Sequence, residues 1–98
     1  MERKRLEALV HGRVQGVGFR WWVRNQAARL NIQGWVANES SGSVRVVAEG
    51  DSAALDQLAA QLAEGPSGAA VERVDATFSM PSGQFQTFDI RAGGHSGD

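Results

Sequence analysis

Hydrophobic and polar residues alternate at the start of the chain and then change to a helical spacing. Leu6, Ala8 and Val10 alternate with mostly polar positions, which predicts a half-buried strand. After residue 19 the apolar positions recur every three or four residues and predict one helical face: Trp22, Val23, Ala27 and Leu30. The chain therefore begins with a strand that leads into an amphipathic helix.

A hairpin is predicted next. Residues 33–38 have the composition of a short strand, and residues 43–49 alternate through Val44 and Val46 as a third strand. The residues between them, 39–42, are of the types that favour turns.

A second helix and two further strands complete the pattern. The second helical stripe follows capping residues 50–52 and stops at residues 64–66; its apolar members are Leu55, Leu58, Ala59 and Leu62. Residues 70–79 predict a fourth strand. A final strand is expected after a turn at residues 80–83, and it would include Phe85, Phe88 and Ile90.

This order of elements predicts the fold class. Strand, helix, strand, strand, helix, strand is the α+β, ferredoxin-like split βαβ arrangement, here with an added C-terminal strand. We expect an antiparallel sheet with two helices on one face, formed by residues 1–92, and a disordered tail at residues 93–98. Right-handed crossovers place the third strand between the first two, so the C-terminal ends of those two share an edge. The segment after the first strand and Asn38 should therefore face one pocket.

The segment between the first strand and the first helix has the character of an anion site. Glycines let successive backbone amides turn toward one point, and a helix N-terminus adds free N–H donors. Arg20 adds a guanidinium that can hold two oxygens at once. The segment lacks the Lys-Ser/Thr of a Walker A loop and the third glycine of a dinucleotide fingerprint. On glycine spacing alone, a flexible turn is an equally good interpretation.

Composition limits the classes of partner. The chain has 98 residues, of which 42% are hydrophobic, and its ten basic and eleven acidic side chains give a net charge of −1. With no global positive field, we expect no nucleic-acid or membrane partner, and any anion site must be local. The chain has no cysteine, and His11 and His95 are expected to lie too far apart to bind a metal together, so no metal is expected. The charged segment 1–5 has no apolar run after it, which favours a cytoplasmic location.

Three segments together resemble the acylphosphatase family. They are Val-Gln-Gly-Val-Gly-Phe-Arg at residues 14–20, Gly-Trp-Val-Ala-Asn at residues 34–38 and Gly-Pro at residues 65–66, within a similarity that runs from about residue 5 to residue 91. The resemblance implies a ferredoxin-like fold and cofactor-free, metal-free hydrolysis of acyl phosphates to a carboxylate and inorganic phosphate. It implies Arg20 as the phosphate ligand and Asn38 as the residue that orients the attacking water. The expected phosphate-binding residues are Gln15, Gly16, Val17, Gly18, Phe19 and Arg20.

Two positions depart from the family pattern. Ala37 stands where the family usually has arginine, and Ser41-Gly42 stands where it has Asp-Gly. We expect the first change to remove a charge near the pocket and the second to alter the rigidity of the turn. Substrate affinity is then more affected than the type of reaction.

Several functional alternatives remain open at this point. The fold also occurs in non-enzymatic anion-binding modules and in RNA-binding modules. The chain is also similar to the acylphosphatase-like domain of larger carbamoyl-transfer proteins. We expect a monomeric enzyme that tolerates many acyl groups, because a small open cradle contacts mainly the phosphate.

Overall fold

Strands and helices follow one another in the predicted order through residues 2–92, the part of the chain that the computed structural model describes. The elements are β1 (Arg3–Arg13), α1 (Phe19–Arg29), β2 (Gln33–Asn38), β3 (Val44–Asp51), α2 (Ser52–Glu64), β4 (Ala70–Ser79) and β5 (Phe88–Arg91). The bounds of β2 and β4 agree with the prediction. Phe85, expected in the last strand, lies before β5 in the connection from β4. The predicted disorder of residues 93–98 falls outside the described residues.

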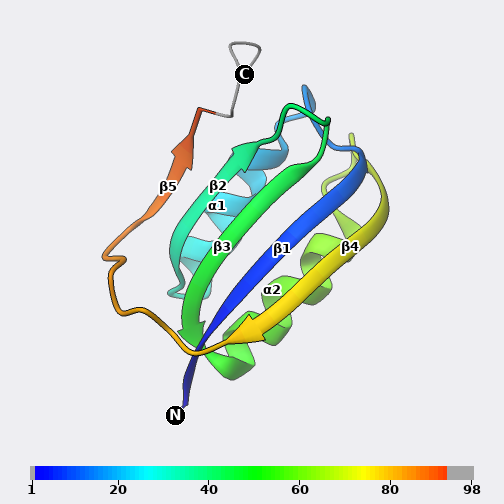
Figure 1. The fold of residues 1–98 in the computed structure, drawn as a ribbon. Coiled ribbons are helices and arrows are strands. Elements are labelled where there is room, and N and C mark those ends of the chain that lie inside the picture. Colours follow the sequence, from blue (N-terminus) through cyan, green and yellow to red (C-terminus); the bar gives the residue numbers. More distant parts are fainter. Residues whose placement is uncertain (1, 93–98) are drawn as a thin grey trace.

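The five strands form one sheet in the order β4-β1-β3-β2-β5 (Figure 1). β3 pairs antiparallel with both β1 and β2, so β1 and β2 run in the same direction with β3 between them, as expected. The ferredoxin-like arrangement is therefore confirmed. The sheet is mixed rather than wholly antiparallel, because β5 pairs parallel with β2. β4 ends beside the start of β1, and the chain then crosses that end of the sheet and runs on beside β2 as β5 (Figure 1).

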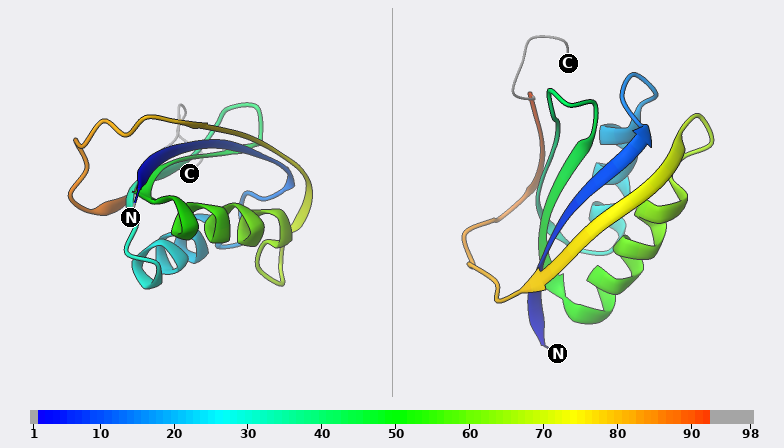
Figure 2. Two further views of the ribbon diagram at one scale, coloured as in Figure 1. Left: turned by 90° about the horizontal axis from the view of Figure 1, so that it is seen from below. Right: turned by 45° about the vertical axis from the view of Figure 1, so that its right-hand side comes forward.

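Both helices cover the same face of the sheet (Figure 2). The core between the layers contains the inward residues of β1 and the predicted stripes of the helices, among them Leu6, Ala8, Val10, Phe19, Val23, Ala27, Leu55, Leu58 and Leu62. Each large side chain buried there stabilises the fold by about 1.5–3 kcal/mol. Trp22 and Leu30 are only partly buried at the margin of this core.

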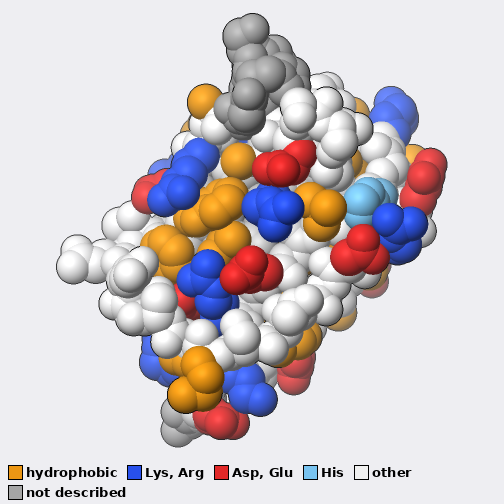
Figure 3. All heavy atoms as spheres, in the orientation of Figure 1, with side chains coloured by type: hydrophobic (Ala, Val, Ile, Leu, Met, Phe, Trp, Pro, Cys, Tyr) orange, Lys and Arg blue, Asp and Glu red, His pale blue; other side chains and the backbone are white. Residues whose placement is uncertain are grey.

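The other face of the sheet is open to solvent and carries charges of both signs among hydrophobic side chains (Figure 3). Arg45 pairs with Glu39 at 3.6 Å, and His11 lies 2.9 Å from Asp75. This mixture of charges differs from the basic, aromatic surface of an RNA-binding sheet. Among residues 2–92, no His, Asp and Glu side chains form a cluster of three or more that could hold a metal ion. In the same part of the chain, neither helix has the length and apolar character needed to cross a membrane.

A buried carboxylate fixes the connection between β4 and β5. Glu49, at 1% exposure, accepts hydrogen bonds from Arg5 Nη1 (2.8 Å), Ser82 N (2.9 Å), Ser82 Oγ (2.8 Å) and Gly83 N (2.9 Å). Burial by itself raises the pKa of Glu49, but these hydrogen bonds outweigh it and lower the pKa to about 2. The ionised Glu49 side chain therefore anchors the connection that leads into β5.

Candidate active site

The loop from β1 to α1 presents unpartnered backbone donors. Gly16 and Gly18 have φ of 73° and 76°, a left-handed conformation that residues with a Cβ rarely adopt. Gly18 is the N-cap of α1, which has no side-chain cap and no acidic residue in its first turn. The first helical hydrogen bond runs from Trp22 N to Gly18 O at 3.0 Å. The amides before Trp22 are left for an external acceptor, and the helix dipole favours a negatively charged one.

Gln15 fastens this loop to the hairpin. Its Nε2 donates to the carbonyl oxygens of Glu39 (2.8 Å) and Ser43 (2.9 Å), the residues on either side of the turn between β2 and β3. The loop and the end of β2 lie at the same end of the molecule in both Figure 1 and Figure 2. Gln15 thus fixes the position of the loop relative to Asn38, the last residue of β2.

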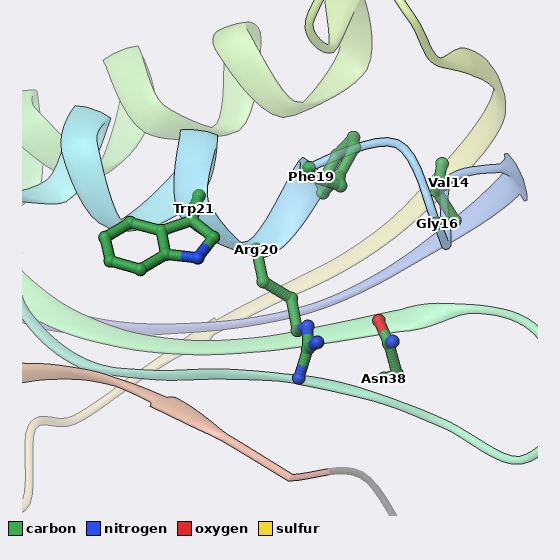
Figure 4. A pocket seen from close by; sticks show the side chains of 7 residues that line it. Val14, Gly16, Phe19, Arg20, Trp21 and Asn38 are labelled. Atoms are coloured by element: carbon green, nitrogen blue, oxygen red, sulfur yellow. The ribbon is translucent and has the colours of Figure 1, made fainter. Parts of the chain in front are cut away.

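Arg20 reaches from the first turn of α1 toward the sheet (Figure 4). Its Nη1 donates to the carbonyl oxygen of Arg91 in β5 at 3.1 Å. This contact orients the guanidinium and still leaves other N–H groups free to donate. An oxyanion with two acceptor oxygens matches the remaining donors.

Asn38 is buried at 5% exposure and projects from β2 on the helix-covered side of the sheet, as Val36 does. The side-chain hydrogen bonds within residues 2–92 leave its amide without a protein partner. The residue is largely buried, but its amide atoms remain open to solvent at the cavity: among the described residues, Gln61 Oε1 is the one side-chain polar atom that is both buried and unpartnered. Its amide lies beside the guanidinium of Arg20 and points toward the loop (Figure 4). It can both donate to and accept from a bound water.

These groups converge on one cavity of about 90 Å³, lined by Val14, Gly16, Gly18, Phe19, Arg20, Trp21 and Asn38. The predicted convergence of the loop with Asn38 is therefore present. Gln15 and Val17 do not line the cavity: Gln15 holds the hairpin, and Val17 packs against the core. The predicted site residues omit three contributors: Val14, Trp21 and the Arg91 carbonyl. Trp21 could have been found from the sequence, because it is an apolar residue next to Arg20 that lies outside the helical stripe. The Arg91 carbonyl could not, because every residue has a backbone carbonyl.

The two departures from the family pattern lie away from the cavity. Ala37 is not among the lining residues, and strand alternation places it on the face opposite Asn38. An arginine at this position would therefore project from the open face of the sheet, and the expectation that Ala37 removes a charge near the pocket stays a prediction. The turn that contains Ser41 is closed by hydrogen bonds from Glu39 N to Ser43 O (2.9 Å) and from Gly42 N to Glu39 O (3.1 Å). These backbone bonds do not depend on an aspartate at position 41.

Comparisons with known proteins agree with this geometry. The family model described as acylphosphatase matches residues 6–90. An acylphosphatase of Salinibacter ruber is 50% identical over 88 residues, which are 90% of this chain and 93% of that protein. The crystal structure of the Bacillus subtilis acylphosphatase has a TM-score of 0.86 at 33% identity, covering 90% of this chain and 98% of that one. A Coxiella burnetii acylphosphatase structure has a TM-score of 0.85 at 37% identity, covering 91% and 93%.

The fold, the anion cradle beside Asn38 and the family match lead to one conclusion. This chain belongs to the acylphosphatase family, whose members hydrolyse the carboxyl–phosphate anhydride of acyl phosphates to a carboxylate and inorganic phosphate.

Proposed function

We propose that the phosphoryl group of the acyl phosphate binds in the cradle formed by residues 15–20, and that Asn38 positions the water that attacks it. One observation carries this assignment: an uncapped helix N-terminus, an oriented guanidinium and an amide that makes no side-chain hydrogen bond within residues 2–92 line the same cavity. The backbone N–H groups and Arg20 would hold the phosphoryl oxygens and stabilise the charge that redistributes in the transition state.

The reaction needs few protein groups. The water oxygen forms a bond to phosphorus while the bond from phosphorus to the acyl oxygen breaks, and the electron pair of that bond leaves with the carboxylate. The proton released by the water passes to the phosphate product or to solvent. Because a carboxylate is a good leaving group, positioning and charge stabilisation are sufficient, and no general acid is required.

Inorganic phosphate is the probe that tests the cradle. In ¹⁵N-labelled protein, we expect phosphate to shift the amide signals of residues 15–20 in a saturable way and to inhibit turnover competitively. Arg20→Ala should weaken phosphate binding at least about tenfold, since it removes a charge-assisted hydrogen-bond donor. Arg29→Ala is the matched control, because it removes an exposed arginine from the other end of α1. Equal binding by both variants, or shifts confined to other residues, would exclude this site.

We also propose that the enzyme acts as a monomer in the cytoplasm. A solution-scattering mass of one chain at all concentrations, and recovery in the cytoplasmic fraction of its cells, test the two statements.

A further inference from the structure

We propose that Trp21 forms the acyl-binding wall of the active site, and that the enzyme favours acyl phosphates with a flat, apolar acyl group over short ones. This inference rests on the proposed position of the phosphoryl group. It starts from an unusual placement: Trp21 is 60% exposed in the first turn of α1, outside the buried stripe of that helix. The hydrophobic core therefore does not explain a tryptophan at this position.

Among the three apolar side chains that line the cavity, Trp21 alone is exposed to solvent. Val14 and Phe19 also line it, but they are 0% and 2% exposed because they belong to the core. The other lining residues are two glycines, Arg20 and Asn38, which present backbone or polar groups. An apolar group that extends from a bound phosphate would gain contact area mainly on the indole ring.

The direction of attack sends the acyl group toward this ring. In an in-line displacement the entering water and the leaving oxygen lie on opposite sides of phosphorus. Asn38 and Trp21 flank Arg20 on opposite sides (Figure 4). If the water is held at Asn38, the leaving carboxylate and its acyl group extend from the phosphate on the side of Trp21.

Arg24 holds the ring in place. Its guanidinium carbon lies 5.1 Å from the centroid of the Trp21 ring, in a cation–π arrangement one helical turn further along α1. A ring with one face covered in this way loses little further freedom when a substrate contacts it. The wall is open to solvent, so it adds a preference of several-fold and does not exclude small acyl groups. It is therefore compatible with the broad tolerance expected from the sequence.

Steady-state kinetics with benzoyl phosphate and acetyl phosphate test this proposal. For Trp21→Ala we expect KM for benzoyl phosphate to rise about 3- to 10-fold, the range of a single aromatic contact. KM for acetyl phosphate, kcat for both substrates and inhibition by inorganic phosphate should change by less than about twofold. Trp21→Phe should retain most of the preference, since it keeps a flat ring. Met80→Ala, which removes an 85% exposed apolar side chain far from the cavity, should change nothing.

The possible failures are distinguishable. If Trp21→Ala leaves the ratio of kcat/KM for benzoyl phosphate to kcat/KM for acetyl phosphate unchanged, Trp21 does not select the acyl group. Weaker inhibition by phosphate in Trp21→Ala would show that this change had disturbed the cradle. Trp21→Phe then decides the question: the inference fails if this variant loses the preference for benzoyl phosphate while phosphate still inhibits it as in the native enzyme. If phosphate does not inhibit the native enzyme competitively, the proposed phosphate position itself fails.

Discussion

Two buried polar side chains illustrate how this protein separates stability from catalysis. Glu49 accepts several hydrogen bonds, so its charge is satisfied and it serves structure. Asn38 is also a largely buried residue, but its amide faces the cavity and makes no side-chain hydrogen bond within residues 2–92. Such an amide can donate to and accept from a water held in the cavity. In the proposed mechanism, that water attacks the phosphoryl group held in the cradle.

Gln15 and Gln61 give a contrasting pair of variants at this scale. Gln15→Leu removes two hydrogen bonds to backbone carbonyls and should lower the free energy of unfolding by about 1–3 kcal/mol. It should also raise KM several-fold, because the loop is no longer fixed to the hairpin. Gln61→Leu should be neutral or stabilising, since Gln61 Oε1 is buried and unpartnered among the described residues. Urea unfolding and steady-state kinetics measure both effects; equal destabilisation by the two variants would contradict this account.

At the scale of elements, the connection from β4 to β5 helps to position Arg20, although it contains no helix or strand. Glu49 holds Ser82 and Gly83 in that connection, and β5 then supplies the Arg91 carbonyl that orients Arg20. An acidic residue near the end of β3 is thus linked through backbone to the guanidinium of Arg20, the proposed phosphate ligand. Hydrophobic pattern analysis has no means of detecting such a link, because none of its members is apolar.

The Glu49 carboxylate should make stability depend on acid pH. Its pKa falls from 4.5 to about 2 on folding, so its contribution is complete above pH 4.5 and is lost as pH falls toward 2. The free energy of unfolding should fall by about 3 kcal/mol, since each unit of change in pKa corresponds to about 1.4 kcal/mol. Urea unfolding from pH 6 to pH 2 should show this decline in the native protein and a shallower one in Glu49→Gln.

Glu72→Gln provides the control, because that carboxylate is exposed on β4. The free energy of unfolding of this variant should depend on pH in the same way as that of the native protein. A Glu49→Gln profile as steep as the native profile would assign the acid sensitivity to other carboxylates.

Across the whole molecule, the sequence predicted what depends on periodicity and on chain topology. The order of elements, the bounds of β2 and β4, and the meeting of the loop with Asn38 at one edge all follow from such patterns. The parallel direction of β5 does not, because the alternation of apolar and polar residues is the same for either direction of a strand. The orientation of the Arg20 side chain could not be predicted from the sequence either, since it depends on a hydrogen bond to the backbone carbonyl of Arg91.

The proposed division of work between binding and attack spans the whole fold. The proposed phosphate cradle lies at the β1–α1 junction, and Asn38, the amide proposed to position the water, lies at the end of β2. The most direct test of this division is to measure kcat for benzoyl phosphate, with chelator present, and inhibition by inorganic phosphate in folded Asn38→Ala. We predict that kcat falls by about 10²–10³, as for loss of one transition-state donor, while phosphate inhibition changes less than about threefold. A kcat close to the native value, or a parallel loss of phosphate binding, would contradict the assignment of Asn38 to the attacking water.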